Sequence, residues 1–270
     1  MPESGDPPGP HTSIERSYPA VTSLRTAWEE HANEFVAWAR APGHDSYWRF
    51  HRDQFLDLLP PPGRATLDIG CGEGRLSRDL RSLGHAVTGV DASPTMAAAA
   101  RDADPSIPVH VADAAALPFD DASFDYAVAF MSLQDVDDMP RAVHEAARVL
   151  EPTGCLCVAV VHPINSAGRF EDDEPGSPFT IAGSYLESFV YRDGVTRDGL
   201  AMTFTSIHRP LSAYTDALSG AGMVVERIRE WPVPETAIRG ERDRRWQRVP
   251  LFLHLRARKA PASPAEGGRA

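Results

Sequence analysis

The sequence has few cysteines and no long apolar run. Its three cysteines, Cys71, Cys155 and Cys157, are too few for a disulfide framework or a four-cysteine zinc site, which favours free thiols in a reducing compartment. No segment reaches the roughly 18 consecutive apolar residues of a membrane span. Residues 1–10 lack the basic and apolar layout of a signal peptide. We therefore expect a cytoplasmic protein with no membrane contact.

Positive charge is scarce as well. Lys and Arg total 27 against 38 Asp and Glu, a formal net charge of −11, and Lys259 is the only lysine. A protein that grips nucleic acid needs a dense cationic face, so no nucleic-acid partner is expected. The preference for arginine over lysine is typical of a GC-rich genome and says nothing about mechanism.

The size and composition are those of a globular protein. The chain has 270 residues, of which 42% are hydrophobic and 24% charged. One large domain with an insertion or lid fits this length. Residues 1–20 and 260–270 are rich in Pro, Gly, Ser and Ala, and we expect both to be disordered. Residues 21–60 carry a helical pattern rich in aromatic residues, split at Pro42-Gly43, and predict a helical lid.

Short apolar strands alternate with helices over residues 61–163. Strands are predicted at 65–69, 86–90, 109–112, 126–131 and 155–161, and helices at 73–83, 95–101 and 140–150. This alternation indicates an α/β fold with a doubly wound, mostly parallel sheet.

The alternation stops after residue 163. Residues 164–207 are rich in Gly, Asp and aromatic side chains and predict a β-rich cap inserted after strand five. Residues 208–259 then complete the sheet. They contain a helix capped by Ser212, followed by strands at 223–228 and 250–257. These two strands have no long helix between them, which favours an antiparallel end to the sheet.

A glycine-rich loop follows the first strand of the sheet. Asp68 stands near the strand end, and Gly70, Gly72 and Gly74 alternate with other residues before the next helix. Glycines let the backbone approach a ligand closely, and helix N-terminal amides favour its anionic groups. A dinucleotide-binding fingerprint would place its third glycine at position 75, where Arg75 stands.

Two further aspartates end the next two strands. Asp91 can accept two hydrogen bonds from the hydroxyls of a ribose, and Asp113 follows the third strand. The series from Asp68 through the glycines to Asp91 and Asp113 resembles class I S-adenosylmethionine (SAM) methyltransferases, in particular the small-molecule "methyltransferase 11" group. The resemblance covers residues 67–161 strongly and extends more weakly through His208-Arg209-Pro210-Leu211.

The resemblance implies a Rossmann-like sheet of seven strands, with SAM as cofactor and S-adenosylhomocysteine (SAH) as product. It implies that Asp68 positions the methionine part, that the loop backbone packs beside it, and that Asp91 binds the ribose. The cofactor-binding residues implied in this way are Tyr47, Asp68, Gly70, Cys71, Gly72, Asp91, Ala92, Met96, Asp113, Ala114, Met131 and Gln134.

Methyl transfer needs alignment, a dry pocket and sometimes a base, because the methyl group on sulfur is already activated. Candidate bases are His162, at the end of strand five, and His208, after the cap; Tyr185 can orient an acceptor. Each of the three can equally serve a structural role. Two acidic groups, at 120–121 and 135–138, are interpreted as solvated loops, and no metal site is expected.

The sequence therefore predicts a SAM-dependent methyltransferase. Its acceptor is expected to be a small, aromatic or apolar molecule of specialised metabolism (natural product biosynthesis), methylated on O, N or C. Two alternatives stay open. One is an NAD(P)-dependent oxidoreductase, which Arg75 disfavours, and the other is a SAM-binding protein without turnover.

Overall fold

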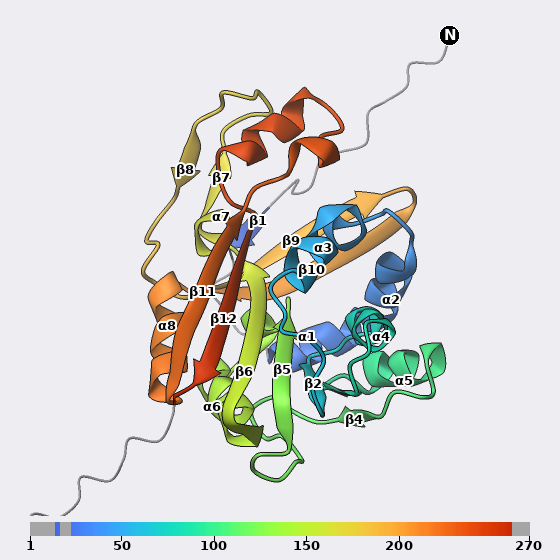
Figure 1. Ribbon diagram of the computed structural model, residues 1–270. Coiled ribbons are helices and arrows are strands. Elements are labelled where there is room, and N and C mark those ends of the chain that lie inside the picture. Colours follow the sequence, from blue (N-terminus) through green and yellow to red (C-terminus); the bar gives the residue numbers. More distant parts are fainter. Residues whose placement is uncertain (1–13, 17–22, 261–270) are drawn as a thin grey trace, which may run out of the picture.

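The computed structural model describes residues 14–16 and 23–260, and its centre is a seven-stranded sheet (Figure 1). The strand order is β11-β12-β6-β5-β2-β3-β4. Strands β2 to β6 are parallel, whereas β12 is antiparallel to both of its neighbours. The predicted Rossmann-like α/β sheet with an antiparallel end is thus confirmed. The strands are β2 (Thr66–Ile69), β3 (Val87–Asp91), β4 (Val109–Val111), β5 (Phe124–Phe130), β6 (Leu150–Val161), β11 (Met223–Trp231) and β12 (Phe252–Lys259).

Helices cover both faces of this sheet, which explains why its central strands are apolar on both sides. Leu67 and Ile69 of β2 pack into the core beneath α6 (Met139–Val149) and α8 (Leu211–Gly220). The opposite face packs beneath α4 (Arg75–Ser82) and α5 (Pro94–Ala103). The polar Asp68 lies between Leu67 and Ile69, and the alternation of side chains along a strand places it on this second face.

The prediction that Ser212 caps the following helix is wrong. Helix α8 begins at Leu211, and the residue before it is Pro210, whose extended backbone leads directly into the first turn. The N–H group of Leu211, at the first turn of the helix, donates instead to the hydroxyl of Tyr185, 3.0 Å away. The hydroxyl of Tyr185 therefore takes the helix-capping role that was expected of Ser212.

The N-terminal segment is helical, as expected from its pattern. It consists of α1 (Leu24–Glu30), α2 (Ala32–Arg40) and a π-helical turn (Tyr47–His51) that continues into α3 (Arg52–Leu56). The break predicted at Pro42-Gly43 falls between α2 and the π-helical turn.

One correction concerns the predicted disordered N-terminus. Residues 14–16 form strand β1 (Ile14–Arg16), which pairs antiparallel with β9 because a free sheet edge offers unpaired backbone groups. The other residues of the predicted disordered ends, apart from Ala260, lie outside the described part of the chain.

Residues 164–207 form helix α7 (Pro163–Ala167), a small hairpin of β7 (Gly168–Phe170) and β8 (Phe179–Ile181), and a long hairpin of β9 (Phe189–Arg197) and β10 (Leu200–His208). Asp198 and Gly199 turn the long hairpin, and both have positive φ, the geometry that a tight two-residue hairpin turn requires. Helices α1 and α2 pack against β10, at the end of the sheet where the parallel strands finish (Figure 1). Within the described residues, no helix is long and apolar enough to cross a membrane.

Candidate active site

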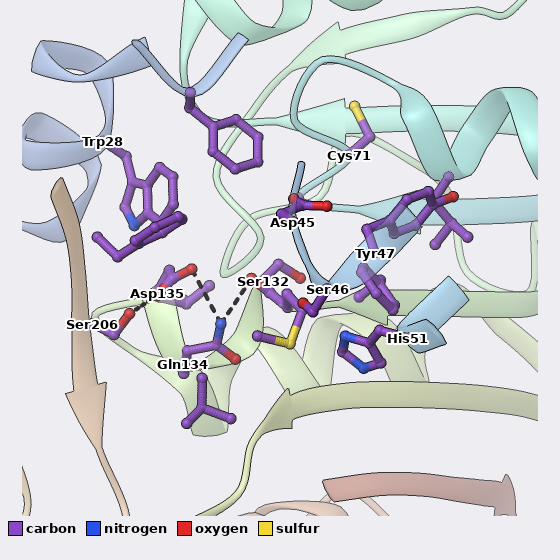
Figure 2. Close-up of a pocket in the computed structure, with 18 of the residues that line it drawn as sticks. Trp28, Asp45, Ser46, Tyr47, His51, Cys71, Ser132, Gln134, Asp135 and Ser206 are labelled. Carbon is purple, nitrogen blue, oxygen red and sulfur yellow. Dashed lines mark hydrogen bonds between the residues drawn. The ribbon is translucent and has the colours of Figure 1, made fainter. Parts of the chain in front are cut away.

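A cavity of about 400 Å³ opens at the carboxyl ends of β2, β3, β5 and β6. Ligands bind in this position in open α/β sheets. The N-terminal helical segment and the β9–β10 hairpin supply its other walls (Figure 2). The predicted cofactor-binding residues that line this cavity are Tyr47, Asp68, Gly70, Cys71, Asp91, Ala92, Met96, Asp113, Ala114, Met131 and Gln134. Gly72 is the one member of the predicted set outside the lining.

The glycine loop is closely packed against the loop that follows β5. Gly70 has φ +69°, and a Cβ atom placed on it would lie 2.4 Å from Cβ of Ser132. The Ser132 hydroxyl in turn donates to the carbonyl of Ile69 at 2.6 Å. Both the left-handed backbone and the missing space require glycine at this position.

We therefore expect Gly70→Ala to lose cofactor binding and stability together. The alanine must either shift Ser132 or distort the loop, a cost on the order of 1–3 kcal/mol for the backbone strain alone. Calorimetric titration with SAH and thermal unfolding measure the two effects. Gly194→Ala is the matched control, because Gly194 has no positive φ and no heavy atom would lie within 4 Å of the added methyl carbon. An unchanged SAH affinity in Gly70→Ala would contradict this account of the loop.

Asp91 is held by two backbone amides. Gly72 N–H donates to its Oδ2 and Ser93 N–H donates to its Oδ1, each at 2.8 Å. Each carboxylate oxygen keeps a second lone pair for a ligand in the cavity. Gly72 thus contributes to the site through Asp91 rather than by lining it. Burial raises the pKa of Asp91 above its ordinary value, and the two amide hydrogen bonds oppose this effect.

Asp113 lines the cavity just after β4. Its Oδ1 accepts a hydrogen bond from Ala115 N–H at 2.8 Å, which is the local turn that an aspartate often forms. The residue nevertheless lines the cavity together with the buried Ala114 and Met96. Asp113 therefore forms a local turn and lines the cavity as well.

Asp68 is almost fully buried beneath the glycine loop. The hydroxyl of Ser77 donates to its Oδ2 at 2.5 Å. Burial raises the pKa of Asp68 to about 7, against the opposing effect of this hydrogen bond. A cationic group bound in the cavity next to Asp68 would favour its charged form and lower this pKa.

The loop after β5 has an unusual conformation. Met131 has φ +54°, which is strained for a residue with a side chain, and strain of this kind gathers at functional sites. The Gln134 amide donates to the Met131 carbonyl at 2.8 Å and stabilises the bend. Arg209 fastens the loop from the other side through the carbonyls of Leu133, Gln134, Val136 and Asp137.

Asp135 lies in this loop and faces the cavity, so its interpretation as part of a solvated loop is wrong. Its Oδ1 accepts from the hydroxyl of Ser206 on β10 at 2.6 Å (Figure 2). Burial raises the pKa of Asp135 to about 8, although Ser206 and Arg209 both lower it. Asp137 and Asp138 also line the cavity but are exposed, and Asp138 caps α6. Sequence spacing within so short a run cannot show which of the three carboxylates is the least exposed.

The N-terminal segment is fastened to the loops that carry the predicted cofactor residues. Glu29 accepts hydrogen bonds from Ser93 and Thr95, just after β3. Arg40 donates to Glu73 in the glycine loop at 3.0 Å. These links join the N-terminal helical segment to the side of the cavity that carries the predicted cofactor-binding residues Asp68, Gly70, Asp91 and Asp113, which we call the cofactor wall.

The hydroxyl group of Tyr47 is hydrogen-bonded within the protein. Tyr47 lines the cavity, and its hydroxyl donates to Asp79 at 2.6 Å. The guanidinium of Arg75 lies 4.3 Å from the centre of the ring and forms an ion pair with Asp45. A cofactor contact from Tyr47 would therefore come from its ring in this arrangement, since its hydroxyl already has a partner.

The three predicted catalytic residues lie outside the cavity lining. His162 accepts from Ile164 N–H through Nδ1, and its Nε2 lies 2.9 Å from Glu230. His208 is fully buried between the hydroxyl of Ser166 and the carbonyl of Tyr185, and the Tyr185 hydroxyl caps α8. His162 was suggested by its place at a strand end, and His208 and Tyr185 by their places after and within the predicted cap, but each is turned toward structural partners.

Aromatic and apolar side chains form the rest of the cavity. Trp28 and Phe35 of the N-terminal segment and Phe204 of β10 contact one another edge to face, with ring centres 5.4 to 6.5 Å apart. Tyr191, Asp193, Val195 and Arg197 also line it, and they alternate along β9 with exposed residues as the geometry of a strand dictates. Such walls suit a flat organic molecule.

Comparison with known proteins agrees with this arrangement. Residues 67–158 match the Methyltransf_11 family model, described as a methyltransferase domain. The chain is 32% identical over 205 residues to the probable S-adenosylmethionine-dependent methyltransferase Rv3030 of Mycobacterium tuberculosis, with 72% of each chain covered. It is 29% identical over 236 residues to a demethylmenaquinone methyltransferase of Beutenbergia cavernae, covering 84% of this chain and 86% of that one.

Among solved structures, a SAM-dependent methyltransferase from Mesorhizobium loti superposes with a TM-score of 0.64 and 25% identity. It covers 79% of this chain and 98% of that one. The chain therefore belongs to the class I SAM-dependent methyltransferases. SAM is its cofactor and SAH the product, and the free lone pairs of Asp91 and the buried carboxyl of Asp68 fit the ribose and ammonium groups of such a ligand.

The raised pKa of Asp68 predicts that SAH binds more tightly as the pH rises from 5.5 to 7. We expect the ammonium group of the ligand to bind beside Asp68, which requires the free protein to release the Asp68 proton. The affinity should thus fall by about tenfold for each pH unit below 7, down to the lowered pKa of the complex. Calorimetry in two buffers of different ionisation enthalpy measures the proton release. Asp68→Asn should remove this pH dependence, and a dependence that survives in the variant would contradict the assignment.

Proposed function

We propose that this methyltransferase methylates a hydroxyl oxygen of a small, planar aromatic acceptor. The observation that carries the proposal is Asp135, a carboxyl group with a pKa of about 8 that faces the cavity between the cofactor wall and the aromatic walls. A general base works best when its pKa lies near the working pH. Phenolic hydroxyls need such a base, because they are mostly protonated at neutral pH.

Two further observations support an aromatic acceptor. Trp28, Phe35 and Phe204 present ring edges and faces next to Asp135 and Ser206. The similar Beutenbergia protein is named a demethylmenaquinone methyltransferase. From the name of that relative we take only the aromatic character of the acceptor for our proposal. A place in cytoplasmic specialised metabolism stays a prediction from the sequence.

In the proposed reaction, SAM supplies a methyl group on electron-poor sulfur and leaves as SAH. Asp135 takes the hydroxyl proton of the acceptor, so that the oxygen can form its bond to carbon as the bond to sulfur breaks. Ser206 holds the Asp135 carboxylate in place through its 2.6 Å hydrogen bond. The lid and the β9–β10 hairpin exclude water and hold the acceptor in line.

Transfer of labelled methyl from SAM to three matched acceptors tests the proposal. The acceptors are 1-naphthol, 1-naphthylamine and naphthalene, with products identified by mass spectrometry. The proposal expects the methyl ether of 1-naphthol and little product from the other two. Preferred methylation of the amine or of ring carbon would overturn it. SAH binding without transfer to any of the three, each supplied at a concentration high enough to fill a weak site, would favour the alternative of a SAM-binding protein without turnover.

A further inference from the structure

Two histidines and a tryptophan form a buried hydrogen-bonded chain beside the cavity. The indole Nε1 of Trp231 lies 3.0 Å from Nδ1 of His254, and Nε2 of His254 lies 2.8 Å from Nε2 of His51. His51 comes from the N-terminal segment, whereas His254 and Trp231 lie on the antiparallel strands β12 and β11. Of the three residues, only His51 lines the cavity.

Trp231 determines which atom is the donor in each of these hydrogen bonds. An indole N–H can only donate, so Nδ1 of His254 accepts and carries no proton. Burial lowers the pKa of His51 and lowers that of His254 to about 3, so both rings are neutral. His254 therefore carries its proton on Nε2 and donates it to Nε2 of His51. The proton of His51 must then lie on Nδ1.

This Nδ1–H group has access to the cavity. It has no hydrogen-bond partner among the described residues, and it is not sealed from solvent. The ring of Phe252 stacks on one face of His51 at 3.6 Å between centres, and Phe130 lies at 4.6 Å. His51 is only 1% exposed, so these rings hold its imidazole in one orientation at the cavity wall.

We propose that His51 determines acceptor specificity by donating its Nδ1–H to a carbonyl oxygen of the acceptor. This proposal rests on the proposed function, because it assigns the acceptor a second oxygen besides the hydroxyl that is methylated. The acceptor class is then a hydroxylated aromatic ketone or quinone. Figure 2 shows Asp135 and His51 on different sides of the cavity, with Ser132 between them. A site built around a fixed donor discriminates strongly against molecules that lack the matching acceptor.

The proton positions are tested first in the unmodified protein. Long-range ¹H–¹⁵N correlation spectra of ¹⁵N-histidine-labelled protein distinguish the two neutral tautomers of each ring. The proposal expects His51 protonated on Nδ1 and His254 protonated on Nε2. Protonation of His51 on Nε2 would overturn it, whatever the acceptor.

The second test uses 1-tetralone labelled with ¹³C at its carbonyl, and tetralin as the matched compound without the oxygen. Binding to SAH-loaded protein is measured by calorimetry, and the carbonyl stretch by infrared difference spectroscopy. We expect tetralone to bind at least tenfold more tightly than tetralin, and its carbonyl stretch to shift to lower frequency on binding. Equal affinities with no shift would overturn the proposal and leave the proposed function standing.

Two variants of His51 form a matched pair. His51→Asn keeps an amide N–H close to the position of Nδ1, whereas His51→Gln places its amide toward the position of Nε2. Asn should preserve the carbonyl shift and most of the tetralone preference, and Gln should lose both. A shift that persists in Gln, with the fold intact by SAH binding, would contradict the role of Nδ1. If neither tetralone nor tetralin binds the SAH-loaded protein, the aromatic-acceptor proposal fails and this one fails with it.

Discussion

Asp135→Asn is expected to lower the rate of methyl transfer by about 100- to 10,000-fold, the range for loss of a general base. Asparagine has nearly the same shape and can still accept from Ser206, but it cannot take the hydroxyl proton of the acceptor. SAH binding should be unchanged, because the cofactor wall is intact. Single-turnover transfer and calorimetric titration of the same preparation measure the two quantities.

The same variant is also expected to be more stable than the unmodified protein at high pH. The pKa of Asp135 is about 8 in the folded chain and near 4 when unfolded, so the folded state binds the proton more tightly. The stabilisation from this group is present at low pH and is lost as the pH rises from about 4 through 8. Asp135→Asn avoids this loss, so its midpoint of thermal unfolding should exceed that of the unmodified protein more at pH 9 than at pH 5.

A matched control separates the site from a general charge effect. Asp120→Asn removes one carboxylate from an exposed loop remote from the cavity lining. It should change neither turnover nor the pH dependence of stability. Equal turnover in Asp135→Asn and Asp120→Asn would contradict a base at position 135, while leaving membership of the methyltransferase family untouched.

Asp91→Ala is expected to weaken SAH binding by about 100- to 10,000-fold. Two hydrogen bonds from hydroxyl groups to a charged carboxylate are worth about 1.5–3 kcal/mol each, and every 1.4 kcal/mol changes affinity tenfold. The substitution also leaves the N–H groups of Gly72 and Ser93 without their partner. Calorimetric titration measures the affinity.

Thermal unfolding without ligand shows how much of the effect of Asp91→Ala is loss of fold. Asp91→Asn supplies an intermediate case, because it keeps one acceptor oxygen but lacks the charge. The expected order of affinity is unmodified protein, Asp91→Asn, then Asp91→Ala. An SAH affinity in folded Asp91→Ala that equals that of the unmodified protein would exclude Asp91 from ribose binding.

The sheet could be predicted because each of its strands has a local signature. The runs ending at Asp68 and Asp91 are short and apolar, and the glycines after Asp68 permit the φ values of +56° to +84° that the structure shows at Gly70, Gly72 and Gly74. The antiparallel end followed from the absence of a helix between the last two strands. These features depend on neighbouring residues in the chain, and sequence reasoning reaches them directly.

The proposed base Asp135 and the proposed hydrogen-bond donor His51 could not be predicted in the same way. The cavity position of Asp135 depends on Ser206 and Arg209, which are more than 70 residues away along the chain. His51 acquires its tautomer from His254 and Trp231 on the far edge of the sheet. Conversely, His162 at a strand end and His208 after the predicted cap were candidate bases, but both face structural partners. Only tertiary packing decides which polar side chain of a loop or strand end faces the cavity.

A crystal structure of the protein with SAH is the most direct test of the account as a whole. The account predicts the ribose hydroxyls on the carboxylate of Asp91, the adenine beside Asp113 and Ala114, and the ammonium group near Asp68. The sulfur would then face the part of the cavity that holds Asp135. Density for SAH elsewhere, or with its ribose away from Asp91, would contradict the central claim that this cavity unites the cofactor with the acceptor.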